Sequence, residues 1–132
     1  MHARVLLPAL AALSACASVP AAKGPVTGDW GGTHVGLRLT AAGGVLDYDC
    51  ATGTIDEPVI LHPDRSFHVT GMHTPGWGGP ERVGELRPSY RTRYTGSVRG
   101  DRMTLQGRVE NGVLLGPFML VRGAEPIIMR CL

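Results

Sequence analysis

Apolar and polar residues alternate along most of this chain, which is the pattern of β-strands with one buried face. Val35, Leu37 and Leu39 fall on one face of a strand, and the polar residues between them fall on the other. Phe67 and Val69 repeat this alternation further along the chain. The pattern predicts strands over residues 34–40, 45–51, 54–62 and 67–72, with turns at 41–44, 52–53 and 63–66.

Two dipeptides in the C-terminal half are turn signals that predict strand register. Gly100-Asp101 is typical of a type II′ turn, and Asn111-Gly112 is typical of a type I′ turn. If each dipeptide forms a two-residue loop, the inward side chains stay in phase across three strands, and a one-residue slip would expose them all. The predicted pairs are Val98–Met103, Gly96–Leu105 and Tyr94–Gly107, followed by Val109–Leu114, Gly107–Gly116, Leu105–Phe118 and Met103–Leu120.

The last strand of this set is apolar on both faces. The predicted register turns Leu114, Phe118 and Leu120 inward, and it turns an equally apolar set outward, namely Leu115, Met119 and Val121. A strand that is apolar on both faces is normally covered on both. We therefore expect the segment at residues 16–26, the loop that carries Trp77 or another chain to cover its outer face.

The whole chain predicts an all-β fold. Nineteen glycines and ten prolines exclude long helices beyond the N-terminal segment, and short strands recur between turn signals. We predict a small antiparallel up-and-down barrel of about eight strands. The opening Gly28-Asp29-Trp30 is similar to the Gly-x-Trp start of lipocalin-type barrels, and the chain is close to avidin in size. This resemblance implies a lipocalin/avidin-like barrel.

The N-terminus has the parts of a secretory signal. Arg4 supplies the positive charge, and an apolar run follows that is shorter than the roughly 20 residues needed to span a bilayer. It closes on Leu13-Ser14-Ala15-Cys16, which resembles the lipobox of bacterial lipoprotein precursors. The resemblance implies a signal peptide at 1–15 and a lipid on Cys16. It also favours the outer over the inner membrane, because neither Ala17 nor Ser18, directly after Cys16, is acidic. The alternative is an ordinary secretion signal with an incidental cysteine.

Processing at this point divides the chain into three parts. We interpret residues 16–26 as a lipidated flexible tether, because they are small and proline-rich. We interpret residues 27–132 as a single β-barrel domain. Cys50 and Cys131 then remain, and an even number of cysteines in an exported chain suggests a disulfide. Two buried thiols are the alternative.

Large aromatic residues are the first candidates for a binding site. Trp77 lies in a Gly/Pro-rich stretch at 74–81, where it either folds back onto the core or contacts a ligand or partner. Trp30 stands at a strand entrance, where it either plugs the barrel or faces a ligand. We expect a small ligand in the barrel mouth, lined by Trp30, Tyr48, Tyr90 and Tyr94.

A set of arginines shares one outward face of the predicted C-terminal strands. Its members are Arg91, Arg93, Arg99, Arg102 and Arg108. The register places Arg93 opposite Arg108 and Arg99 opposite Arg102, and like charges directly opposite each other destabilise a hairpin. Either the side chains splay into water, or acidic neighbours such as Glu85 and Glu110 offset the repulsion, or anions occupy the gap. An anionic partner would be a lipid, a cell-wall polymer or an acidic protein.

Other chemistry finds little support in the sequence. His34, His62, His68 and His73 lack the tight spacing of metal ligands, so no metal or cofactor is expected. A formal net charge of +2 does not argue for nucleic acid as a partner. There is no nucleophile elbow and no phosphate-binding loop.

Three functional hypotheses follow. The leading one is an envelope-anchored, non-enzymatic binding module for a small ligand. The second is a protein-interaction or inhibitor module that uses the Trp77 loop and the apolar strand. The third is an enzyme with dispersed catalytic residues, which the sequence does not favour.

Overall fold

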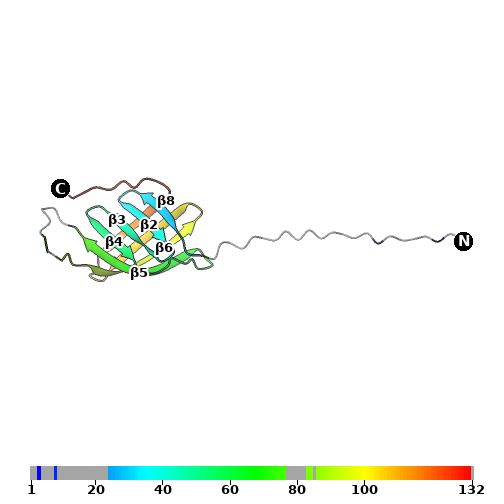
Figure 1. The fold of residues 1–132 in the computed structure, drawn as a ribbon, viewed down its shortest axis with the longest axis horizontal. Helices are drawn as coiled ribbons and strands as arrows, with labels where there is room; N and C mark the ends of the chain where they lie inside the picture. The colour runs from blue at the N-terminus through cyan, green and yellow to red at the C-terminus, as the bar shows by residue number, and fades with distance from the viewer. Residues whose placement is uncertain (1–2, 4–7, 9–23, 77–82, 85, 132) are drawn as a thin grey trace.

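Eight antiparallel strands close into a barrel (Figure 1). The computed structural model describes residues 3, 8, 24–76, 83–84 and 86–131. Each strand pairs with its neighbour in the chain, and β1 also pairs with β8, which closes the barrel. The all-β up-and-down prediction is therefore confirmed. The strands are β1 (Gly28–Gly32), β2 (Val35–Thr40), β3 (Gly43–Tyr48), β4 (Ala51–Ile55), β5 (Ser66–Pro75), β6 (Tyr90–Arg99), β7 (Arg102–Val109) and β8 (Leu114–Arg122).

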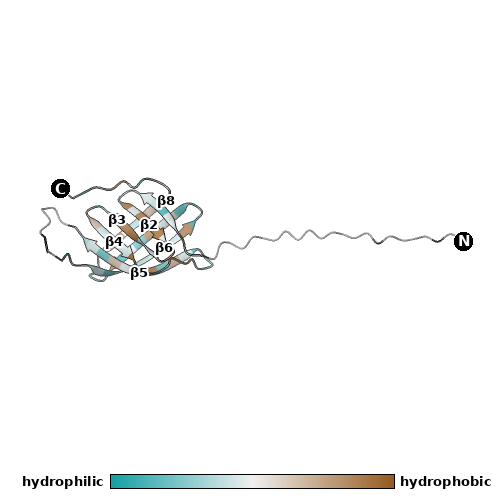
Figure 2. Cartoon of the chain, in the orientation of Figure 1, coloured by the Kyte–Doolittle hydropathy of each residue, from teal (hydrophilic) through white to brown (hydrophobic). Residues whose placement is uncertain are grey.

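The period-two alternation of the sequence fills the barrel interior. Side chains such as Val35, Leu37 and Leu39 of β2 point inward and are buried, whereas Arg38 between them is exposed. Figure 2 shows apolar and polar residues alternating along the strands. Trp30, Leu46, Tyr94, Met103, Leu105 and Leu120 are among the largest fully buried side chains. The middle of the barrel is thus a packed core.

The β6–β7 hairpin has the predicted register. Val98 pairs with Met103, Gly96 with Leu105 and Tyr94 with Gly107. A Cβ atom on Gly107 would lie only 3.1 Å from Cε1 of Tyr94, so the tyrosine ring occupies the space beside the glycine. The missing side chain lets the ring pack flat against the next strand.

The predicted β7–β8 register is correct for only half its length. Met103 pairs with Leu120 and Leu105 with Phe118, as predicted, but Gly107 pairs with Leu115 instead of Gly116. Gly116 and Pro117 together stand opposite Gln106, which is the two-against-one arrangement of a β-bulge. The Asn111-Gly112 turn also spans more than two residues, because the Val109 amide donates to the carbonyl oxygen of Val113.

This bulge reverses two side chains of β8. Leu114 is 54% exposed, and Leu115 packs against the core, so the prediction of Leu114 inward and Leu115 outward is wrong. Beyond the bulge the original phase returns, with Leu120 buried and Met119 and Val121 exposed. The bulge therefore shifts the beginning of β8 relative to the rest of the strand.

The predicted turn at Thr52-Gly53 is also wrong. Both residues lie inside β4, and the chain turns at Asp49-Cys50 instead. Gly53 is needed within the strand because a Cβ there would approach the Tyr94 hydroxyl oxygen at 2.9 Å. The predicted strand at 54–62 ends at Ile55, and the following loop buries Val59.

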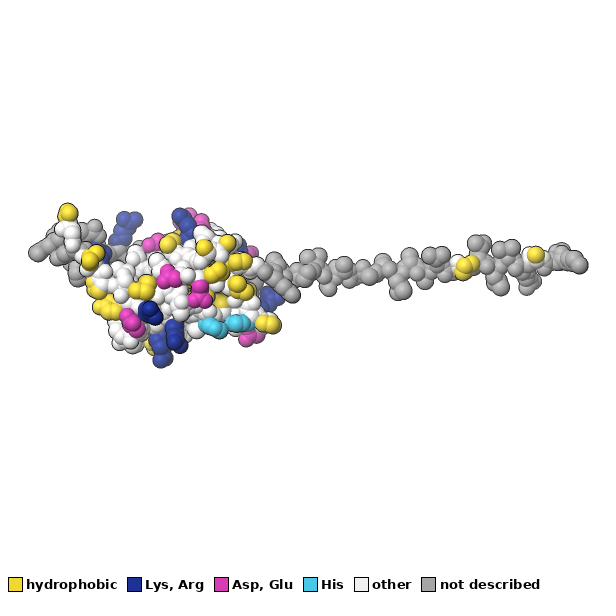
Figure 3. All heavy atoms as spheres, turned by 60° about the horizontal axis from the view of Figure 1, so that its bottom comes forward, with side chains coloured by type: hydrophobic (Ala, Val, Ile, Leu, Met, Phe, Trp, Pro, Cys, Tyr) yellow, Lys and Arg dark blue, Asp and Glu magenta, His cyan; other side chains and the backbone are white. Residues whose placement is uncertain are grey.

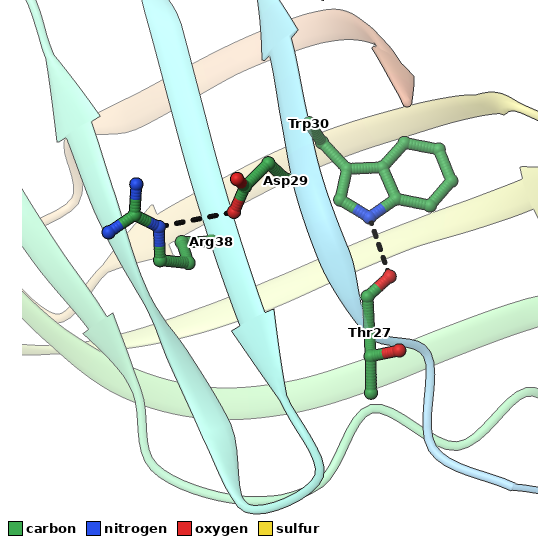
Figure 4. Close-up of polar contacts among 4 residues, drawn as sticks. All are labelled: Thr27, Asp29, Trp30 and Arg38. Carbon is green, nitrogen blue, oxygen red and sulfur yellow. Dashed lines mark hydrogen bonds and ion pairs between the residues drawn. The ribbon is translucent and has the colours of Figure 1, made fainter. Parts of the chain in front are cut away.

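The end of the barrel where β1 begins and β8 ends, here called the base, is sealed by Trp30. Trp30 is 1% exposed, and its indole Nε1 donates to the carbonyl oxygen of Thr27 at 3.3 Å (Figure 4). The Arg122 guanidinium lies over the indole ring, 4.3 Å from its centroid, and Nη1 donates to the same carbonyl at 2.8 Å. Val26 adds to the seal through its amide, which donates to the Val59 carbonyl oxygen.

The C-terminal segment runs along the outside of the barrel and is fastened at two points (Figure 1). Ile127 exchanges backbone hydrogen bonds with the turn that joins β1 to β2, through the His34 amide and the Gly32 carbonyl oxygen. Further on, a disulfide joins Cys131 to Cys50, as the sequence predicts. The disulfide holds this segment beside the turn between β3 and β4.

No described residue belongs to a helix with the length and apolar character needed to cross a bilayer.

Candidate functional site

The opposite end of the barrel from the base, here called the mouth, opens into a cleft of about 820 Å³. This volume lies within the range of small-molecule sites, about 300–1,000 Å³. Its lining combines the turns after β1 and β3, the end of β5 and the bulged start of β8. The lining residues are Thr33, His34, Tyr48, Asp49, Cys50, Ala51, His73, Pro75, Leu114, Leu115, Gly116, Pro117, Phe118 and Met119.

The part of the cleft lining that β8 contributes is apolar. The bulge turns Leu115 toward the core beside Phe118, while Leu114 and Met119 stay exposed at the edge. The Phe118 ring lies 5.7 Å from the Tyr48 ring, centroid to centroid. An apolar molecule in the cleft would therefore contact leucine, methionine and aromatic surfaces together.

Two polar side chains of this lining are buried without a partner. Tyr48 is 6% exposed and His73 is 7% exposed, and their rings meet edge to face with centroids 5.7 Å apart. By hydrogen-bond geometry, neither the Tyr48 hydroxyl nor Nδ1 of His73 has a partner among the described residues, although the Tyr94 hydroxyl lies close enough to Tyr48 to act on its pKa. A buried polar atom left unpaired costs about 1–3 kcal/mol, so such atoms are rare in folded proteins.

Both groups are neutral near pH 7. Burial, and to a smaller extent the neighbouring Tyr94 hydroxyl, raises the pKa of Tyr48 far above its usual range. Burial lowers the pKa of His73, because the imidazolium ion loses hydration inside the barrel. The cleft thus presents a phenol, which donates or accepts, and an imidazole with one donor and one acceptor nitrogen.

The rim of the cleft carries a histidine and a carboxylate that are already in contact with each other. His34 Nδ1 contacts Asp49 Oδ2, and the other carboxylate oxygen accepts a hydrogen bond from the Met129 amide at 2.7 Å. A carboxylate that orients a histidine is also part of the hydrolase triad. In the described part of the chain, however, no hydroxyl or thiol group hydrogen-bonds to His34, and Cys50 is in a disulfide. The pair therefore ties the C-terminal segment to the rim.

The four aromatic residues expected in the mouth occupy different parts of the barrel. Tyr48 lines the cleft, as expected. Trp30 seals the base at the other end, and Tyr94 lies in the core, where its hydroxyl donates to the Met72 carbonyl oxygen at 3.4 Å. Tyr90 is half-buried at the start of β6 and is not part of the cleft lining. The structure therefore does not bring the four rings together.

Trp77, the other aromatic candidate, lies outside the described residues, as does the lipidation candidate Cys16. Their predicted roles remain predictions.

The predicted arginine face exists on the outside of β6 and β7. Arg93 stands opposite Arg108 and Arg99 opposite Arg102, and Arg91, like these four, is exposed. Arg91, Arg93 and Arg108 share a surface hollow with Asp56 and Glu110. Figure 3 shows basic and acidic side chains side by side on one face of the molecule. Acidic residues thus accompany the arginines, and binding of an anionic partner stays a prediction.

The four histidines do not form a common site. His62 and His68 stack on the surface, with Nε2 of the first 3.3 Å from Nδ1 of the second. His34 and His73 belong to the mouth. Across the described ranges, no three histidine, cysteine or acidic side chains come together as a set that could hold a metal ion.

His73 lines the cleft but is not among the four aromatic residues that the sequence predicts there. The sequence does carry a signal, because His73 continues the inward series Phe67, Val69, Gly71 on β5, just as Tyr48 continues Leu46 on β3. A polar residue at the last inward position of a strand faces the barrel mouth. The contribution of Leu115 could not be found in this way, because it depends on the bulge.

Comparison of the chain with known protein-family models, with curated proteins and with solved structures finds no match.

Proposed function

We propose that this protein is a non-enzymatic binding module that holds a small, largely apolar molecule in the mouth of its barrel. One observation carries the proposal: two unpartnered, buried polar groups, Tyr48 and His73, line an apolar cleft of suitable volume. A ligand with an apolar body and one polar group would fill the cleft and remove the cost of leaving these atoms unpaired. The packed core below confines the ligand to the mouth.

The outer face of β8 provides a test with a built-in control. Met119 and Val121 are both apolar, outward-facing and exposed, but only Met119 lines the cleft. A lysine at Met119 would place a charge at the edge of an apolar site, whereas a lysine at Val121 would stand in water. Both substitutions are at exposed positions, so neither should prevent folding.

The test measures binding of a neutral apolar dye, N-phenyl-1-naphthylamine, by its fluorescence. The exported chain carrying Cys16→Ser should bind the dye, and Met119→Lys should weaken binding about fivefold or more. Val121→Lys should leave the affinity unchanged. A protein that does not bind this dye and that purifies without any small molecule detectable by native mass spectrometry would contradict the proposal.

The exposed strip on β8 supports a second candidate, a protein-interaction or inhibitor module. Leu114, Met119 and Val121 are 54%, 61% and 44% exposed along β8, from the mouth toward the base. If an envelope protein covers this strip, Met119→Lys and Val121→Lys should both reduce its capture by crosslinking in intact cells. Loss of crosslinking with both variants favours a protein-interaction module. Loss of dye binding with Met119→Lys alone favours a small-molecule binding module.

We further propose that the module acts in the bacterial cell envelope, held to a membrane by a lipid on Cys16. The lipobox-like residues 13–16 support this placement. The disulfide is also consistent with an exported protein, because disulfides persist in oxidising compartments.

A further inference from the structure

The polar groups of the cleft are all neutral or already paired. Tyr48 and His73 present uncharged hydrogen-bonding atoms, and the Asp49 carboxylate at the rim is occupied by His34 and by the Met129 amide. The described lining contains no lysine or arginine. An ionised group entering this cleft would lose water without gaining an opposite charge from the described lining.

The cost of that desolvation discriminates between ligands of similar shape. A buried carboxylate without a counter-charge is strongly disfavoured, whereas a buried hydroxyl needs only its hydrogen bonds. The fixed negative charge of Asp49 adds repulsion for an anion. A cation has no free carboxylate to meet in the described lining, because both oxygens of Asp49 are engaged.

The hydrogen-bonding groups of Tyr48 and His73 further restrict which polar group a ligand can place in the cleft. The Tyr48 phenol donates one hydrogen, and a neutral His73 with an unprotonated Nδ1 accepts one. A ligand hydroxyl can accept from the first and donate to the second, so a single group can pair both. The two rings are in edge contact, with centroids 5.7 Å apart, which places them in the same wall of the cleft.

We propose that the mouth cleft selects a neutral amphiphile, an apolar chain that ends in a hydroxyl group paired with Tyr48 and His73, over the carboxylate of the same chain length. This inference rests on the proposed function. The apolar chain would lie against Leu115, Phe118 and Met119, which the bulge of β8 and the strand beyond it bring to the cleft.

The experiment compares 1-decanol with decanoate at pH 8 by isothermal titration calorimetry. The exported chain carrying Cys16→Ser is used, so that its own acyl groups cannot compete for the cleft. We expect 1-decanol to bind at least about tenfold more tightly than decanoate. Tyr48→Phe should weaken 1-decanol binding about fivefold and leave decanoate binding unchanged. Tyr90→Phe is the matched control, because Tyr90 is not part of the lining, and should change neither.

Each other outcome has a definite meaning. If decanoate binds as tightly as 1-decanol or more tightly, the inference is overturned while the binding function stands. If Tyr90→Phe weakens the binding of 1-decanol as much as Tyr48→Phe does, the ligand hydroxyl does not pair with Tyr48 and His73. The inference is then also overturned. If neither compound nor the neutral dye binds, the proposed function fails together with the inference.

Discussion

At the scale of single residues, the buried imidazole of His73 makes stability depend on pH. Burial lowers the pKa of His73 in the folded protein below that of an exposed histidine, which is about 6.5. Between these two pKa values the unfolded chain binds more protons than the folded chain. The stability that depends on a neutral His73 is therefore fully present above about pH 6.5, and it is lost as the pH falls through the pKa of His73 in the folded protein.

His73→Phe should remove this dependence while keeping a ring of similar size. We expect the wild-type free energy of unfolding to fall relative to that of the variant as the pH drops from 7.5 to 5. The slope of the difference should approach at most about 1.4 kcal/mol per pH unit. Urea unfolding at several pH values measures it, and the other histidines cancel in the difference. Parallel curves for the two proteins would show that His73 is not desolvated.

At the scale of elements, the bulge in β8 depends on a glycine with a positive φ angle. Gly116 has φ +82°, and an added Cβ would lie 2.9 Å from the Leu105 carbonyl oxygen. Gly112 in the preceding turn has a similar φ of +92° but open space around it. Both positions share the backbone strain of a left-handed conformation, and only Gly116 adds a steric clash.

The two glycines make a matched pair for substitution by alanine. Gly112→Ala should cost about 1 kcal/mol of stability, and Gly116→Ala should cost roughly 1–2 kcal/mol more. Urea unfolding midpoints give both values. Gly116→Ala should also weaken binding of the neutral dye, because the bulge turns Leu115 toward the core beside the cleft. Equal destabilisation by the two variants would mean that β8 can relax without the bulge.

The same element shows what the sequence could and could not predict. Alternation gave the inward residues of β2, β5, β6 and β7 correctly, because each of these strands keeps one phase between its turns. A two-residue loop at Asn111-Gly112 would exchange the orientations of Leu114 and Leu115, and the apolar pattern does not reveal the difference because either phase of β8 is apolar. Local sequence predicts a turn at Gly53, because the group that requires a glycine there, the Tyr94 hydroxyl, belongs to a strand two positions away in the barrel.

The candidate site was harder to predict than the fold for a related reason. The sequence indicated aromatic residues as a class, but position along each strand decides which end of the barrel a side chain faces. Trp30 and Tyr48 both point inward, yet one seals the base and the other lines the mouth. That distinction follows only once strand lengths and turns are known.

The disulfide is the second element-scale feature with a measurable effect. It links residues 81 positions apart, and in the chain-entropy argument a loop of this length is worth about 4–5 kcal/mol. Cys131→Ala should lower the free energy of unfolding by about this amount under oxidising conditions. The Cys50→Ala/Cys131→Ala double variant should lose no more than the single one, and a reducing agent should bring the wild type to the same level. An unchanged urea midpoint in the single variant would contradict this account.

At the scale of the whole molecule, the two ends of the barrel are built differently. The N-terminal segment enters at the base, where the Val26 amide donates to Val59 and the Trp30 indole is stacked under Arg122. The cleft opens at the opposite end, with its rim fixed by the disulfide and by the contact between Asp49 and Met129. The proposed tether would therefore join the barrel at the base and leave the mouth free of the proposed anchor.

This separation predicts that anchoring and binding are independent. Cys16→Ser should move the protein from the membrane fraction to the soluble fraction, because the proposed acyl chains supply the anchoring energy, about 0.8 kcal/mol for each buried methylene. Its affinity for the neutral dye should equal that of the anchored protein measured on washed membranes. Met119→Lys gives the opposite pattern, with normal fractionation and weakened binding. Retention of the Cys16→Ser protein in the membrane fraction would instead mean that the barrel surface, and not a lipid, holds the molecule there.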